Sequence, residues 1–165
     1  MCMYVKPGDK VKVAEEDLTF YKVLMTRTDE GHPAYRTFFR NVPIQFGKTY
    51  EQEDKTFTVR NDEHMRMLYQ RIDENAYHLF ATYETALDFI RLNGFKHFDW
   101  KNIVCKAIVP KGTRYMEGVY PTYECPSFIG ASQKPVRRLI AEHPSIVTKA
   151  VRYEMLTPDE TATAK

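Results

Sequence analysis

The stretch from Ala76 to Thr113 restricts the fold of this chain more than any other, because several independent signals agree within it. Residues 76–80 are mostly aromatic and apolar, which is typical of a β-strand whose alternate side chains point to opposite faces. Thr82 is a favourable N-cap for a helix over residues 83–93, since its hydroxyl can accept an unpaired backbone N–H. We therefore expect a strand, this helix, and a second strand that ends at Pro110, which cannot donate to a ladder.

The expected helix and second strand each present one apolar face. The helix face consists of Tyr83, Ala86, Leu87 and Ile90, at helical spacing. The strand face consists of Ile103, Cys105, Ala107 and Val109, in strict alternation. Both faces are predicted to pack into a core, so Cys105 is interpreted as a packing residue and not as a nucleophile.

Short β-like segments occupy most of the remaining chain. Leu18–Met25 is apolar on both faces and is predicted to be a central strand. Residues 113–123 are aromatic and contain a proline, which favours a loop. Residues 61–75 show both helical spacing and alternation, so a short helix and a ragged strand both remain open. Because strands and helices do not alternate along the chain, we expect an α+β fold with mainly antiparallel strands and one helix, over residues 83–93.

Length and composition narrow the functional class. The chain has 165 residues, 43% of them hydrophobic, which predicts one globular domain over residues 1–156 and a flexible tail over 157–165. A formal charge of +2 is too small for bulk electrostatic binding of nucleic acid. The sequence has no apolar run long enough to span a membrane and no signal pattern at its start. Three cysteines at unrelated spacings indicate free thiols in a reducing cytoplasm.

The chain contains no recognisable catalytic or metal-binding motif. The five histidines are scattered without metal-ligand spacing, and the glycines do not form a phosphate-binding loop. Cys125 follows Glu124, whose charge would raise the thiol pKa, so it is a poor nucleophile. We therefore predict no metal and no resident cofactor.

The stretch 76–113 resembles part of the ADP-ribosyltransferase-like fold. In that family a strand ending in Ser or Thr leads into a helix with an alanine and an aromatic residue, and a strand ending in Pro-x-Gly-Thr follows. The matching residues here are Ala81-Thr82, then Ala86 and Phe89, then Ile103–Thr113. The resemblance implies that residues 127–139 correspond to the next family element, a small-residue segment before a glutamate-containing strand.

The family's catalytic groups have no clear counterparts in this sequence. The first core strand offers Tyr21 and Lys22 where the family needs Arg or His. The turn before the helix retains only Thr82, and neutral Gln133 stands in the region expected to hold the glutamate, with Glu142 too far along the chain. A neutral side chain cannot stabilise developing positive charge on a ribose as a carboxylate does. The resemblance therefore implies a degenerate transferase fold without the transferase reaction.

The chain also resembles short uncharacterised proteins of gut bacteria and their phages. The shared motifs are a YKVL-type strand, a GKxY turn, a histidine before the helix, and VPKGxxY. Here they are Tyr21–Leu24, Gly47–Tyr50, His78 and Val109–Tyr115. This resemblance implies an accessory protein of phage or mobile-element type, located in the cytoplasm of the host or in the virion.

These observations predict a protein that acts by binding another protein or, as a lesser alternative, a nucleotide-like ligand. A transferase that uses a nicotinamide dinucleotide and a structural component of a virion are the other functions that remain open. The candidate ligand-binding residues are His78, Thr82, Tyr115 and Gln133. The candidate interface residues are Trp100, Tyr120, Tyr123, Arg137 and Arg138, because aromatic side chains and arginine are favoured at protein interfaces.

Overall fold

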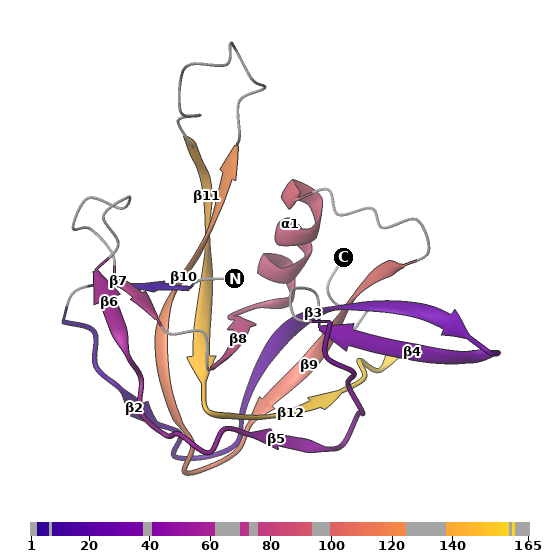
Figure 1. Ribbon diagram of the computed structural model, residues 1–165, viewed down its shortest axis with the longest axis horizontal. Coiled ribbons are helices and arrows are strands. Elements are labelled where there is room, and N and C mark those ends of the chain that lie inside the picture. The colour runs from indigo at the N-terminus through magenta and orange to yellow at the C-terminus, as the bar shows by residue number, and fades with distance from the viewer. Residues whose placement is uncertain are drawn as a thin grey trace.

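Antiparallel strands in one twelve-stranded sheet organise this protein, whose computed structural model describes residues 3–6, 8–37, 41–61, 70–72, 76–93, 100–124, 138–158 and 160 (Figure 1). In chain order the elements are β1 (Tyr4–Val5), β2 (Lys12–Val13), β3 (Leu18–Asp29), β4 (His32–Thr37), β5 (Thr49–Glu51), β6 (Val59–Asn61), β7 (Gln70–Ile72), β8 (Tyr77–Phe80), α1 (Tyr83–Asn93), β9 (Lys101–Val109), β10 (Arg114–Glu124), β11 (Arg138–Thr148) and β12 (Ala150–Glu154).

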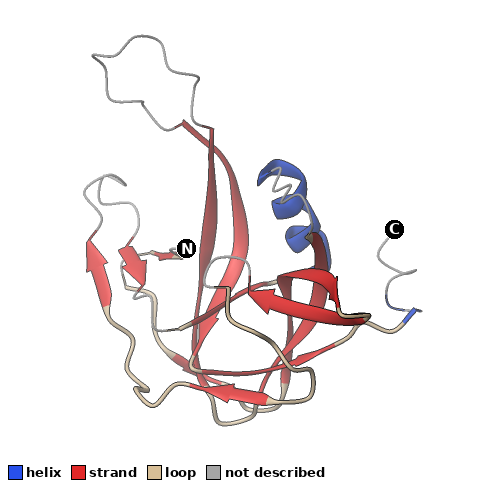
Figure 2. Ribbon diagram, turned by 45° about the vertical axis from the view of Figure 1, so that its right-hand side comes forward, coloured by secondary structure: helices blue, strands red, loops and turns tan. Residues whose placement is uncertain are grey.

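The sheet has the strand order β5-β12-β9-β3-β8-β11-β10-β1-β7-β6, with β2 added beside β10 and β4 beside β3. All of these pairs are antiparallel. Figure 2 shows α1 against this strand framework; it is the one helix named within the described residues. The predicted α+β class with mainly antiparallel strands is therefore confirmed at this coarse level.

The expected strand, helix and strand are present as β8, α1 and β9, and α1 has the predicted bounds. Thr82 caps the helix as expected: its Oγ1 accepts a hydrogen bond from the Thr85 backbone N–H at 3.1 Å. At the other end, Asn93 Nδ2 donates to the Phe89 carbonyl oxygen at 2.9 Å. This side-chain bond spans the last turn of the helix.

The buried side of α1 is centred differently from the expected one. Ala86 and Phe89 are fully buried, whereas the expected Tyr83, Leu87 and Ile90 are only partly buried. Phe89 packs against Phe80 of β8, with ring centroids 5.0 Å apart. With Val23 of β3, these aromatic and small side chains form the layer between α1 and the sheet, which we call the helix layer.

β3 is the central strand that its apolar sequence predicts. One edge pairs with β9 from Leu18 to Thr26. The other edge meets β8 at Tyr21 and then β4 from Leu24 onward. Both edges and both faces of β3 are covered over its middle residues, which is why apolar side chains occur on both faces.

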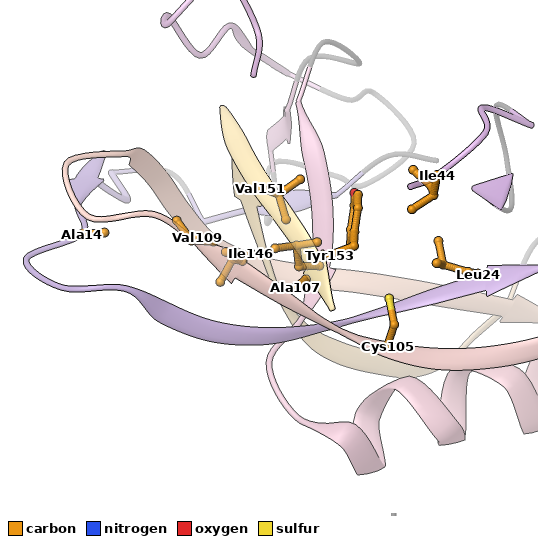
Figure 3. Close-up of a cluster of buried hydrophobic side chains, with 10 residues drawn as sticks. Ala14, Leu24, Ile44, Cys105, Ala107, Val109, Ile146, Val151 and Tyr153 are labelled. Atoms are coloured by element: carbon orange, nitrogen blue, oxygen red, sulfur yellow. The ribbon is translucent and has the colours of Figure 1, made fainter. Parts of the chain in front are cut away.

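The opposite side of the sheet carries the largest hydrophobic cluster, which we call the inner core (Figure 3). Its buried members are Ala14, Leu24, Ile44, Leu79, Cys105, Ala107, Val109, Ile146, Val151 and Tyr153. The predicted apolar face of β9 is confirmed, since its residues contribute to this cluster. Burial raises the pKa of the Cys105 thiol to about 12, so this sulfur packs as a small apolar group.

The expectation of a loop over residues 113–123 was wrong, because β10 spans Arg114–Glu124 and pairs with β11 along its whole length. Pro121 lies within this strand, opposite Glu142. The strand tolerates Pro121 because β1 meets β10 only at Val119. Beyond Val119, no described strand lies along the outer edge of β10, so the missing N–H of proline breaks no ladder hydrogen bond there.

The open choice for residues 61–75 is resolved in part. Gln70–Ile72 form strand β7, while residues 62–69 and 73–75 lie outside the description.

Of the predicted tail, residues 157, 158 and 160 are described, and Glu160 Oε1 forms an ion pair with Lys106 Nζ at 2.5 Å. No helix among the described residues is long and apolar enough to cross a membrane.

The N-terminal strand crosses β10 at very short range. β1 pairs with β10 through Tyr4 and Val119, and with β7 on its other side. Met3 and Val5 are buried in a third cluster with Ile72, Met116 and Val147. A Cβ on Gly118 would lie 2.2 Å from the Tyr4 carbonyl oxygen, so only glycine permits this approach.

We predict that Gly118→Ala costs about 3 kcal/mol of unfolding free energy, because a methyl group here collides with backbone that cannot rotate away. Gly112→Ala is the matched control: space is open around it, but its φ of +80° makes alanine strained by roughly 1–2 kcal/mol. Urea unfolding of both variants measures the difference. An equal or smaller loss for Gly118→Ala would contradict the close crossing of β1.

Candidate functional site

The predicted ligand residues do not converge on one cleft in the described structure. His78 pairs with Val147 of β11, whereas Tyr115 pairs with Thr148, the next residue of the same strand. Successive residues of a strand face opposite sides, so His78 and Tyr115 lie on opposite faces of the sheet. Thr82 uses its hydroxyl to cap α1. Gln133 lies outside the described residues.

The cavity that His78 lines is too small for an organic ligand. It has a volume of about 10 Å³ and is lined by Met3, His78, Leu79, Phe80, Tyr120 and Ser145. This volume holds at most one water molecule. The His78 carbonyl oxygen accepts a hydrogen bond from Lys22 Nζ at 2.6 Å, which ties β8 to the central strand β3. His78 therefore belongs to the packing between the helix layer and the N-terminal strand.

A buried polar chain connects α1 to the β10–β11 pair. Asn93 Nδ2 at the end of α1 donates to Thr122 Oγ1 of β10 at 3.2 Å. Thr122 Oγ1 lies 2.9 Å from Nε2 of His143, which is 4% exposed. This geometry suits a neutral imidazole whose Nε2 accepts the threonine hydroxyl proton.

Aromatic rings surround this histidine. Phe80, Phe89 and Tyr120 have ring centroids 6.3, 5.9 and 6.5 Å from that of His143. Burial lowers the pKa of His143, and the charge of nearby Asp88 opposes that shift. Tyr120 was predicted as an interface residue, but its ring packs within the helix layer against Phe89, 5.1 Å away.

From this polar chain outward, β10 and β11 continue as a two-stranded ribbon, which we call the arm (residues 120–124 and 138–143) and which has Thr122 and His143 at its base. Figures 1 and 2 show it rising past the rest of the sheet. Among the described strands, β8 joins β11 only over residues 145–148, and β1 joins β10 only at Val119. Both edges of the arm are therefore without a described strand neighbour.

The arm carries the most exposed apolar side chains of this region. Leu139 is 41% exposed and Ile140 is 44% exposed. Tyr123 pairs with Leu139, and the register shifts here so that Ile140 has no partner opposite it, which makes a β-bulge. Of the other predicted interface residues, Arg138 begins β11 with its side chain outside the description, and Arg137 lies wholly outside it.

Trp100 lies at another place in the fold, beside the outer part of the β3–β4 pair. The guanidinium carbon of Arg27 lies 4.7 Å from the Trp100 ring centroid, and that of Arg36 lies 6.0 Å from it. Arg27 is also held by Asp29, at 3.1 Å. The indole is half-buried and is held by these cation–π contacts. Trp100 therefore lies beside β3 and β4 and not on the arm, and its role at an interface stays a prediction.

Sequence reasoning missed the polar chain from Asn93 to Thr122 and His143 and the exposed pair Leu139 and Ile140. The three polar residues are separated by 29 and 21 positions, and no local motif links them. Comparison of the chain with protein-family models, curated proteins and solved structures finds no match. Any functional assignment of this chain therefore rests on its own geometry.

We predict that acid weakens the fold through His143. Its pKa is lower folded than unfolded, so below about pH 6.5 the unfolded chain binds a proton that the folded chain resists. The free energy of unfolding should fall between pH 7 and pH 5, by at most about 1.4 kcal/mol per pH unit for one proton. His143→Gln should flatten this slope, whereas the exposed His32→Gln should keep it.

Denaturant unfolding across this pH range provides the measurement. The quantity compared is the slope with pH, so a constant loss of stability in His143→Gln does not affect the test. If His143→Gln retains the parental slope, the buried neutral imidazole is refuted.

Proposed function

We propose that this chain acts by binding another protein through the arm, as a non-catalytic accessory protein of phage or mobile-element type. The observation that carries the proposal is the exposure of Leu139 and Ile140 on a ribbon that extends past the rest of the sheet. Exposed apolar side chains grouped with an aromatic residue, here Tyr123, are typical of protein-binding surfaces.

The arm also defines the chemistry of its partner. The described strands leave both of its edges open, so backbone N–H and C=O groups are offered in addition to side chains. An extended segment of a partner can add to such an edge, with apolar side chains at alternate positions that contact Leu139 and Ile140. Six residues, 138–143, span about 20 Å at 3.3 Å per residue, enough for a short strand of this kind.

The polar chain favours binding through the arm because it holds the surface in place before the partner arrives. Thr122 and His143 lie at the base of the arm, and Asn93 fixes them to α1. A surface already ordered loses less conformational entropy on binding than a mobile one. The arm therefore offers a preformed strand edge.

The test is site-specific crosslinking in the cell that makes the protein. A photoreactive residue at position 140 should capture a defined partner, and the same residue at Leu92, a 48% exposed leucine on α1, should not. The captured protein is then purified and titrated against the variants Ile140→Glu and Leu92→Glu. We expect Ile140→Glu to weaken binding at least about tenfold, because it places a charge in an apolar contact.

Three outcomes contradict the proposal. They are equal capture from positions 140 and 92, no specific capture from position 140, and an affinity that Ile140→Glu leaves unchanged. Leu92→Glu controls for a general effect of added negative charge, since both variants change an exposed aliphatic side chain to glutamate.

A transferase acting on a nicotinamide dinucleotide is the second candidate. What favours it is the succession of β8, the Thr82 cap, α1 and β9, the same order on which the resemblance to the ADP-ribosyltransferase-like fold rests. Turnover of the dinucleotide by the purified protein would support this candidate over binding alone. Loss of that turnover in Thr82→Ala would show in addition that Thr82 acts in the reaction. Absence of turnover leaves protein binding as the proposal.

A further inference from the structure

A groove of about 350 Å³ lies where β1, β2 and β10 meet, away from α1. Its lining residues are Tyr4, Lys6, Asp9, Lys10, Lys12, Glu117, Gly118 and Val119. Glu117 pairs with Ile146 of the inner core, so the groove opens on the face of β10 opposite the helix layer. Its volume is within the range of sites for small molecules.

The charges in the groove do not cancel. Lys12 Nζ forms an ion pair with Glu117 Oε2 at 2.7 Å, so these two charges compensate each other. Asp9 Oδ2 accepts the Lys6 backbone N–H at 2.8 Å, and the Asp9 N–H donates to the Lys6 carbonyl oxygen at 3.1 Å. No ion pair joins the ammonium groups of Lys6 and Lys10 to a carboxylate among the described residues.

The reciprocal bonds between Lys6 and Asp9 also fix the loop that carries the cations. Gly8 has a φ of +93°, which glycine adopts without strain, and this closes the turn. The lysine-bearing loop is therefore anchored at its turn, and Lys12 is held at the start of β2 by its pair with Glu117.

The wall beneath the cations is aromatic and apolar. Tyr4 is 9% exposed and lines the groove beside Val119. Gly118 lines the groove through its backbone, next to Val119. The groove thus has lysine ammonium groups at its rim, and the Tyr4 ring and the Val119 side chain in its wall.

We propose that this groove binds a small organic phosphate. The phosphate lies among the ammonium groups of Lys6 and Lys10, which act as point charges for it, and the organic part lies against Tyr4 and Val119. The site is separate from the arm, since it uses the part of β10 that lies below Pro121. Phosphate binding here and protein binding at the arm can therefore be tested independently.

The experiment is isothermal titration of the full chain with AMP and with ribose 5-phosphate at low ionic strength, and adenosine as the uncharged comparison. We expect saturable binding of at least one phosphate compound and none of adenosine at the same concentrations. The double variant Lys6→Gln/Lys10→Gln should weaken binding at least about tenfold, because it removes two of the three ammonium groups that line the groove and leaves the Asp9 carboxylate without a nearby excess of positive charge. Lys101→Gln, which removes one exposed charge at β9, should leave binding unchanged.

Four results overturn the proposal: neither phosphate compound binds, adenosine binds as tightly as AMP, the double variant binds as well as the parent, or Lys101→Gln weakens binding as much as the double variant does. Since Lys6 and Lys10 are exposed, the double variant should fold normally, and a thermal melt confirms this. If its melting temperature drops, the single variant Lys10→Gln gives the deciding comparison.

Discussion

The antiparallel ladder between β10 and β11 supports the rest of this structure. Its inner half lies within the sheet, with β8 along β11 and β1 along β10, and contributes Ile146, Val147 and Met116 to two separate hydrophobic clusters. Its outer half has no described strand on either side and rises as the arm. The same pair of strands therefore builds the core at one end and offers a surface at the other.

Two local features keep these roles compatible. Gly118 allows β1 to approach β10 closely, so that β1 covers the inner part of the β10–β11 ladder. Above it, Thr122 and His143 connect the ladder to Asn93 of α1, so the arm leaves the sheet from a fixed base. A buried polar chain with satisfied partners has a strong geometric preference, since a broken link would leave a buried donor or acceptor unpaired. This geometric constraint supports the proposal that the arm binds a partner.

The segment from β8 to β9 could be predicted from the sequence because its determinants are local. Thr82, the helical spacing after it and the alternation around Cys105 each depend on residues only a few positions apart. β10 could not be predicted in the same way, because a proline among tyrosines is typical of a loop. Pro121 fits a strand only because the outer edge of β10 has no described partner there, and the sequence does not reveal this. Phe89 became the centre of the helix layer only because Phe80 and Tyr120 come together from distant parts of the chain.

The candidate site was harder to predict than the fold for the same reason. The proposed surface depends on the register between Tyr123 and Leu139, which a bulge shifts by one residue and which no local pattern reveals. The separation of His78 from Tyr115 depends on that ladder too, because it fixes which face each residue occupies. Residue type alone suggested a shared cleft, and the alternation of side chains across the sheet places the two on opposite faces.

The central claim is that the arm is an ordered surface before any partner binds, and amide hydrogen exchange of the free protein tests it most directly. If the arm is ordered, ladder-bonded amides in residues 120–123 and 139–143 should exchange within about tenfold of those in residues 145–148, since both halves open together. Exchange of the arm amides at the rate of an unstructured peptide, with residues 145–148 still protected, would contradict it.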